Sequence, residues 1–251
     1  MKVTRTIAEL EPGIGVIGLV PTMGALHAGH AALIGAARDE CDTVVVSVFV
    51  NSAQFDSAAD LAAYPHEEEQ DLELAAASGA DIVFAPAATE MYPAGFQTWV
   101  EVEELSRGLE GEHRPGHFRA VATVCLKLFN IVRPQFAYFG QKDAQQLAVV
   151  RQMARDLNLD LTVRSIPTVR DPDGLALSSR NARLSIEERV RALALPRALA
   201  TRDPDAARAL LDGLEVDYVE VADFDPPVLA AAVRVGSTRL IDNVVLTEEE
   251  Q

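Results

Sequence analysis

Cysteine is scarce in this sequence, which has 2 among its 251 residues, Cys41 and Cys125, and no CxxC pair. This scarcity excludes a disulfide framework and a cysteine-based structural zinc site, and we expect both thiols to be buried as small apolar side chains. Basic residues are also few, with 22 Lys and Arg against 38 Asp and Glu, for a formal net charge of -16. Because phosphate backbones are bound by basic patches, this balance argues against a nucleic-acid partner.

Long apolar runs are missing as well. No uninterrupted apolar stretch reaches roughly 18 residues, and the N-terminal stretch MKVTRTIAEL has no apolar signal region. We therefore expect no membrane partner and a cytoplasmic location. Lysine is limited to Lys2, Lys127 and Lys142, so an anionic ligand must be met by a few locally placed cations.

Strand-like and helix-like segments alternate through residue 165, which is typical of a parallel sheet covered by helices. The predicted strands are 16–20, 43–50, 81–85, 136–140 and 161–166. The predicted helices are 28–40, 66–78, 117–133 and 143–158. We predict a Rossmann-like α/β domain over residues 1–168, with helices on both faces of the sheet.

The pattern changes after Pro167, where the turn-rich stretch VRDPDGLALSSRNARLS begins two residues later. The predicted elements that follow are helices at 186–200 and 204–211 and strands at 216–224 and 239–246. We predict a smaller C-terminal α+β lid domain over residues 169–251.

The stretch PTMGALHAGH, residues 21–30, follows the first predicted strand and opens the first predicted helix. A helix N-terminus favours phosphate, and His27 and His30 are spaced to project to the same side. Two imidazoles there could stabilise a pyrophosphate leaving group. Capping histidines and a zinc pair are the alternatives, although no third zinc ligand is evident. The GxGxxG pattern at 13–18 precedes or interrupts the strand, so it does not fit a dinucleotide fingerprint.

Polar side chains also follow two other predicted strands. Asn51 and Gln54 come just beyond the second strand, where open α/β sheets bind ligands, although a plain turn would explain them equally well. FGQKD ends the fourth strand, and Lys142 there is unfavourable at a helix N-terminus unless it meets an anion. Asp143 could cap that helix or accept a hydrogen bond from a ribose hydroxyl.

Three loop segments complete the candidates. LALSSRN contributes Ser178, Ser179 and Arg180 ahead of a helical run, where serines could also serve only as caps. GEHRPGHF carries Arg114 in a loop that could bring a cation over a bound anion or be a surface turn. The acidic run at 66–71 could offer Mg²⁺ a carboxylate, although such runs more often form the first turn of a helix.

Taken together, these segments resemble the pantothenate synthetases (pantoate–β-alanine ligases) of the HxGH nucleotidylyltransferase superfamily. One HxGH is weakly specific, but eight collinear segments between residues 16 and 243 are highly specific. They are PTMGALHAGH, VNSAQF, YP at 64–65, MYP at 91–93, GEHRPGHF, FGQKD, DGLALSSRN and GSTRLIDN.

The resemblance implies an ATP-dependent ligase of the coenzyme A pathway. Pantoate would attack the α-phosphorus of Mg-ATP to give pantoyl adenylate and pyrophosphate, and the amine of β-alanine would then displace AMP. An acyl adenylate hydrolyses readily, so the reaction needs a water-excluding lid. The resemblance also implies a homodimer. A nucleotidylyltransferase and a non-catalytic nucleotide-binding relative are the alternatives.

The resemblance also implies roles for individual residues. His30 would be the proton donor, with His27 and Lys142 on phosphate, Asp143 on ribose and the flap residue Arg114 over the site. The residues implied to bind ATP are Met23, Gly24, Ala25, Leu26, His27, Ala28, Gly29, His30, Gly140, Gln141, Lys142, Asp143, Val169, Leu177, Ser178, Ser179 and Arg180. The residues implied to bind pantoate and β-alanine are Asn51, Gln54, Tyr64, Arg114 and Gln146.

Several positions depart from the family pattern. Ala28 replaces a usual Glu, Ser52 a usual Pro and Leu177 a usual Met, while His66-Glu67 follow Tyr64-Pro65 in place of Arg-Thr. Gln70 lies in the acidic run from which the family draws a magnesium ligand, so that ligand is not assigned. The segment between about residues 193 and 216 is shorter than in the family.

Overall fold

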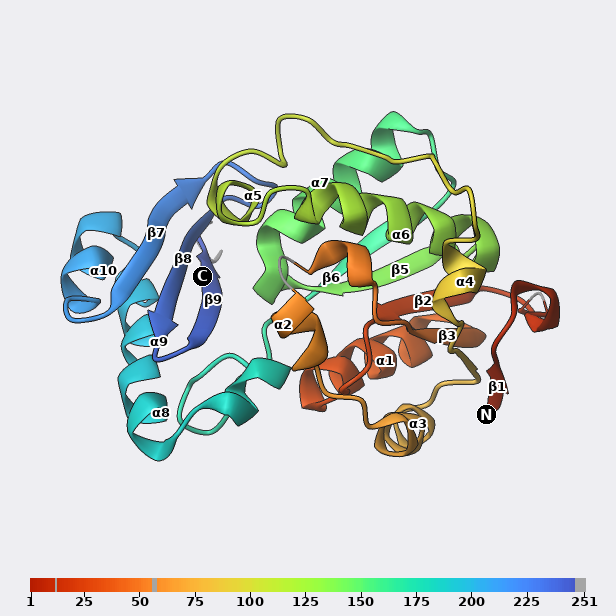
Figure 1. Cartoon of the computed structure of the whole chain (residues 1–251), viewed down its shortest axis with the longest axis horizontal. Coiled ribbons are helices and arrows are strands. Elements are labelled where there is room, and N and C mark those ends of the chain that lie inside the picture. The colour runs from red at the N-terminus through yellow and green to blue at the C-terminus, as the bar shows by residue number, and fades with distance from the viewer. Residues whose placement is uncertain (12, 56–57, 247–251) are drawn as a thin grey trace. The chain divides into compact units, whose positions relative to one another are not determined.

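The computed structural model describes residues 1–11, 13–55 and 58–246. The chain divides into two compact units (Figure 1). The first comprises Met1–Phe139 and Val149–Ile166, and the second comprises Gly140–Ala148 and Pro167–Gln251. The QKD segment therefore groups with the C-terminal part of the chain, although it lies between two segments of the first unit.

The first unit is built on a six-stranded sheet with the strand order β1-β4-β3-β2-β5-β6. Its strands are β1 (Lys2–Thr4), β2 (Ile17–Thr22), β3 (Thr43–Val48), β4 (Ile82–Phe84), β5 (Phe136–Gly140) and β6 (Thr162–Ile166). The ladders that join β1 to β4, β4 to β3, β3 to β2 and β2 to β5 are all parallel. The parallel α/β prediction is confirmed, but β1 was not predicted because three residues, two of them exposed, give little periodicity.

Both faces of the central strands are buried, as a sheet covered on two sides requires. Alternate residues such as Val20, Val44 and Val46 pack with Ile34 of α1 in one cluster. The intervening residues, such as Val45, are buried on the other face. Figure 1 shows α1 and α3 on one side of the sheet and α6 on the other.

The helical elements of this unit connect its strands, and the candidate site residues lie near the ends of those strands. These elements are η1 (Ile7–Glu9), α1 (Ala28–Glu40), η2 (Ser52–Gln54), α2 (Ala58–Ala62), α3 (Glu68–Ala77), α4 (Ala88–Met91), α5 (Leu109–His113) and α6 (His117–Val132). Helix α7 (Ala144–Asp156) begins in the second unit and ends in the first. Among the described residues, no helix is both long and apolar enough to cross a membrane.

The second unit is an antiparallel sheet with helices. Its sheet has the order β7-β8-β9, with β7 (Glu215–Ala222), β8 (Val228–Val235) and β9 (Thr238–Val245). Its helical elements are η3 (Gln141–Asp143), η4 (Ser179–Arg183), α8 (Ile186–Ala192), α9 (Ala194–Leu199) and α10 (Pro204–Leu210). The core includes Leu195, Leu199 and Leu211 with Leu229 of β8, so the segment between 193 and 216 closes a buried core.

One prediction in this unit was wrong, and one strand was not predicted. The single helix over 186–200 is divided at Leu193 into α8 and α9, because Pro196 has no N–H to continue the ladder from Ala192 and therefore stands in the first turn of a new helix. Strand β8 was not predicted, since its sequence VLAAAVRV is buried on both faces and carries no alternation. The two flanking strands were predicted to within about two residues.

Candidate active site

The PTMGALHAGH turn is held by hydrogen bonds to a buried carboxylate of another helix. Gly24 (φ 83°) and Ala25 (φ 52°) both have left-handed backbones, which reverse the chain between β2 and α1. Asp71 of α3 accepts hydrogen bonds from the backbone N–H groups of Ala25 (2.9 Å) and Leu26 (2.6 Å). Tyr64 donates from its hydroxyl to the Gly24 carbonyl (3.2 Å). The turn is thus fixed by two side chains that approach it from later in the chain.

The two histidines of the turn cap α1 with one nitrogen each. The N–H of Gly29 donates to Nδ1 of His27 (3.1 Å), and the N–H of His27 donates to Nδ1 of His30 (3.2 Å). Because a backbone N–H can only donate, each Nδ1 accepts, and the neutral ring carries its proton on Nε2. The rings lie 4.2 Å apart between centroids. Capping is therefore present, and it places the N–H donor of each imidazole on the opposite edge of the ring.

The zinc interpretation of these histidines finds no support, since the described residues form no cluster of three or more His, Cys, Asp or Glu side chains that could hold a metal. Ala28 is exposed and begins α1. A glutamate at this position would complement the positive end of the helix, and its loss leaves the first turn without an acid. This departure therefore changes the outer surface of the turn.

Gln54 and Asn51 form a buried amide pair at η2, beyond strand β3. Asn51 Nδ2 donates to Gln54 Oε1 (3.0 Å) and to the Ala120 carbonyl (3.3 Å). Gln54 Nε2 in turn contacts Met23 Sδ at 2.8 Å. Because Asn51 takes the oxygen of the Gln54 amide, the nitrogen of that amide faces Met23 in the PTMGALHAGH turn. The neighbouring Ser52 is exposed and outside this pair.

The carbonyl of Gln54 is clamped by the loop that was predicted as a flap. Arg114 Nη2 donates to it (3.1 Å), and His117 Nδ1 lies 3.0 Å from it. Since a carbonyl only accepts, His117 is protonated on Nδ1 and its Nε2 accepts from Arg114 Nη1 (3.1 Å). Glu110 is buried 3.9 Å from Arg114. This guanidinium is therefore engaged by a carbonyl, a neutral imidazole and a carboxylate of the same unit.

In the second unit, the QKD turn η3 carries Lys142 and Asp143 at the start of α7. Lys142 Nζ lies 3.5 Å from Asp143 Oδ1. Asn243 of β9 donates from Nδ2 to the carbonyls of Gln141 and Lys142, both at 2.9 Å. Gln146, in the first turn of α7, is partly buried. The strand β9 thus supports the backbone that carries the lysine.

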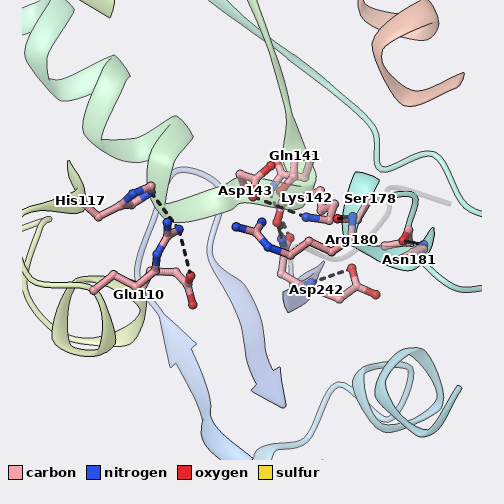
Figure 2. A network of polar contacts seen from close by, with 12 residues as sticks. Glu110, His117, Gln141, Lys142, Asp143, Ser178, Arg180, Asn181 and Asp242 are labelled. Carbon is pink, nitrogen blue, oxygen red and sulfur yellow. Dashed lines mark hydrogen bonds and ion pairs between the residues drawn. The ribbon is translucent and has the colours of Figure 1, made fainter. Parts of the chain in front are cut away.

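The serine pair opens η4 of the same unit. Ser178 is its N-cap and accepts from the N–H of Arg180 (3.3 Å). The preceding loop is a narrow hairpin in which the Leu177 N–H donates to the Val169 carbonyl (3.0 Å) and Arg170 pairs with Ala176. Figure 2 shows Ser178 and Arg180 with the residues of the QKD turn. Capping explains Ser178, whereas Ser179 and Arg180 follow it into the short helix.

The structure places the predicted site residues in two groups. In the first unit lie Met23–His30, Asn51, Gln54, Tyr64 and Arg114. In the second unit lie Gly140–Asp143, Gln146, Val169 and Leu177–Arg180. Sequence reasoning did not single out Asp71, Asp242 or Asn243, although Asp71 lies in the acidic run and the other two in GSTRLIDN. Their importance comes from hydrogen bonds to segments far away in the sequence.

Comparison with known proteins agrees over nearly the whole chain. The family model of pantoate-beta-alanine ligase matches residues 2–245. The pantothenate synthetase of Heliobacterium modesticaldum is 51% identical over 261 residues, covering 92% of this chain and 91% of that protein. The pantothenate synthetase of Geobacter sulfurreducens is 50% identical over 260 residues, covering 93% and 92%.

Solved structures also agree in fold. The crystal structure of pantothenate synthetase from Thermus thermophilus is 43% identical with a TM-score of 0.94, covering 98% of this chain and 99% of that one. The pantoate-beta-alanine ligase of Francisella tularensis, solved in complex with beta-gamma ATP and beta-alanine, is 34% identical with a TM-score of 0.85, covering 98% and 97%. The predicted fold class and family resemblance are therefore confirmed: this chain belongs to the pantoate–β-alanine ligase family.

Proposed function

We propose that the protein condenses pantoate with β-alanine to form pantothenate, with ATP cleaved to AMP and pyrophosphate through pantoyl adenylate. The observation that carries the proposal is the capped histidine pair: His27 and His30 each accept a backbone hydrogen bond at Nδ1 and carry a donor at Nε2. The Francisella relative, solved with beta-gamma ATP and beta-alanine, supports the same substrates for this chain.

In the first half-reaction, a carboxylate oxygen of pantoate attacks the α-phosphorus of ATP and the bond to the β-phosphate oxygen breaks. Negative charge develops on the departing pyrophosphate, and donors already aimed at that charge lower the barrier. We assign this role to His30 and His27, with Lys142 and Arg180 as the cations on phosphate. The Gln54 amide, oriented by Asn51, would bind pantoate together with Gln146.

In the second half-reaction, the amine of β-alanine attacks the acyl carbon of the adenylate, loses a proton and releases AMP. The mixed anhydride must be kept from water until the amine arrives. We propose that the second unit serves as the lid for this step. Its compact core supports a rigid lid despite the short segment between 193 and 216.

Magnesium is proposed only as the ion that accompanies ATP as part of the substrate. An ion carried on phosphates needs few protein ligands, because phosphate oxygens and water supply most of its coordination. Two acids of the run are already engaged, since both oxygens of Asp71 accept backbone hydrogen bonds and Glu68 is paired with Arg5, and nothing distinguishes the exposed Glu67 and Glu69 as ligands. We therefore assign no metal ligand and derive no step through the ion.

We also propose that the enzyme is a homodimer that works in the cytoplasm. The family resemblance supports the dimer, which sedimentation velocity would test directly. Cys41 and Cys125 are both free and buried, as predicted, which suits a reducing compartment. Cell fractionation with an antibody would test the location.

The decisive experiment isolates the adenylation step. We expect pantoate-dependent exchange of labelled pyrophosphate into ATP without β-alanine, and equimolar AMP and pantothenate once β-alanine is added. Pyrophosphate release that leaves AMP on the product would instead indicate a nucleotidylyltransferase. Tight ATP binding without any exchange would indicate a non-catalytic relative.

The matched variants separate the chemistry of His30 from its capping role. His30→Asn retains an oxygen close to Nδ1 and lacks the distal N–H, so we expect exchange to fall by roughly 10²–10³ with little loss of stability. His66→Ala, at an exposed histidine outside the turn, is the control. A His30→Asn enzyme that keeps most of its exchange activity would refute the assigned role.

A further inference from the structure

Asn243 on β9 is a fully hydrogen-bonded buried amide that joins the C-terminal sheet to the QKD turn. Its Nδ2 donates to the carbonyls of Gln141 and Lys142, and its Oδ1 lies 3.4 Å from Gln141 Nε2. The opposite amide orientation would place an oxygen against two carbonyl oxygens, so the assignment is unambiguous. Only 4% of Asn243 is exposed. The backbone of Lys142 is thus held by an amide about 100 residues later in the chain.

The preceding residue, Asp242, holds the other cationic segment. Its carboxylate binds Arg170 through two hydrogen bonds, at 2.6 and 3.1 Å, and accepts the Asn243 N–H at 2.8 Å. Arg170 lies in the hairpin that leads to Ser178, and it also donates to the Gly174 carbonyl (3.2 Å). The side chain of Asp242 is 1% exposed, so the carboxylate of this bidentate pair is shielded from water.

We propose that Asp242 and Asn243 are positioning residues. Both lie on strand β9, and together they hold the segments that carry Lys142 and Arg180, so that the two cations keep fixed positions for binding the triphosphate. Strand β9 contacts both η3 and η4. Asn243 holds the backbone of η3, and the adjacent Asp242 holds Arg170 in the hairpin that leads into η4. Figure 2 shows Asp242 near the residues of both short helices. An acidic protein must concentrate a few cations at a phosphate site, and a shared rigid support does this with little reorganisation. The inference rests on the proposed function, because it takes Lys142 and Arg180 to be the phosphate ligands.

The same sheet offers a matched control. Arg239 of β9 binds Asp217 of β7 at 2.6 Å, a pair as short as that between Arg170 and Asp242. Asp217 lies on β7, and its pair joins two strands of the sheet. Asp217→Asn therefore removes a comparable ion pair from the same sheet without removing a support of η3 or η4.

The test is a double-mutant cycle on the affinity for a non-hydrolysable ATP analogue, measured by titration calorimetry on the full chain. We expect Asn243→Ala to weaken binding by roughly tenfold or more in the native background and by less than about threefold in a Lys142→Ala background. Asp242→Asn should show the same dependence on Arg180→Ala. If Asn243→Ala does not fold, Asn243→Asp replaces it in the test, because aspartate keeps the size of the side chain and puts an acceptor oxygen in place of the NH₂ donor.

The Asp217→Asn control separates a loss of stability from a loss of nucleotide affinity. Asp217→Asn should lower the melting temperature while it leaves the ATP-analogue affinity within about twofold. Additive losses in both cycles, or an equal loss of affinity in Asp217→Asn at the same loss of stability, would overturn the inference. Because the calorimetry needs no pantoate, a failed exchange reaction with normal nucleotide coupling would refute the proposed function alone. A wild-type protein that does not bind the analogue would overturn both.

Discussion

Replacing Asp71 by Asn tests how the HxGH turn is held in place. The carboxylate accepts from Ala25 and Leu26, and each hydrogen bond to a charged acceptor contributes ~1.5–3 kcal/mol. Asparagine keeps one acceptor and turns its NH₂ group toward the second N–H, while relief of a buried charge offsets part of the loss. We expect a net loss of about 1–3 kcal/mol in the free energy of unfolding.

The assay combines thermal unfolding with pyrophosphate exchange. For a chain of this size each kcal/mol lowers the melting temperature by roughly 2–4 °C, so we expect a drop of about 2–12 °C. Exchange should fall by roughly 10- to 100-fold, because the histidines move with the turn. Glu69→Gln, at an exposed acid in the same helical turn, is the control. If Asp71→Asn matches Glu69→Gln in both measurements, Asp71 does not hold the turn.

The same carboxyl predicts opposite effects of pH on activity and stability. Burial raises the pKa of Asp71, although the N–H groups of Leu26 and Ala25 act in the other direction. The folded state therefore binds this proton at a higher pH than the unfolded chain, so the group adds stability as the pH falls and loses that contribution as the pH rises through the raised pKa. Protonation keeps both oxygens and places no NH₂ group against the turn, unlike asparagine, but it weakens the two hydrogen bonds that fix the turn. On acidification, exchange activity should therefore begin to decline at a pH above the usual carboxyl pKa of about 4. Rates and melting temperatures across this range test it, and an identical acid limb in Asp71→Asn would contradict it.

Two further predictions concern His117 and the cysteines. His117→Asn keeps a donor close to the Nδ1 position, which faces the Gln54 carbonyl, whereas His117→Gln keeps only a group at the Nε2 position. We expect the KM for pantoate to rise less in His117→Asn than in His117→Gln and the KM for ATP to stay unchanged in both. Equal KM values for pantoate in the two variants would show that the hydrogen bond to Gln54 does not matter. Burial raises the pKa of Cys125 to about 12 and that of Cys41 above its usual value, so iodoacetamide at about pH 8 should label neither thiol until the protein unfolds. Mass spectrometry of native protein checks this, and rapid labelling would show that the thiols are exposed.

The elements that sequence predicted best are those with strong local signals. Helix α1 was predicted over residues 28–40 and strand β5 over 136–140, as observed, because motif residues and turn signals delimit both. Strand β8 was missed because three consecutive alanines favour a helix, and only pairing with β7 and β9 makes this segment a strand. Tertiary pairing overrides local preference there.

The same distinction between local signals and distant partners applies to the residues of the candidate site. Residues with unusual chemistry for their position, such as Lys142 at a helix start, could be singled out from the sequence. Asp71 could not, because an acid within an acidic run is indistinguishable from an ordinary first turn of a helix until its partners at residues 25 and 26 are known. Asn243 was quoted within a motif but given no role, since its partners lie about 100 residues away.

The hydrogen bonds of His27 and His30 explain why this turn requires imidazole. In the proposed mechanism each position needs an acceptor on the near edge for the helix, which the structure shows, and a donor on the far edge for the leaving group. Lysine and arginine have no acceptor, and serine is too short to present both at opposite edges. A change to one of these residues therefore loses either the start of the helix or the proposed proton donor, so two separate requirements act on each of these positions.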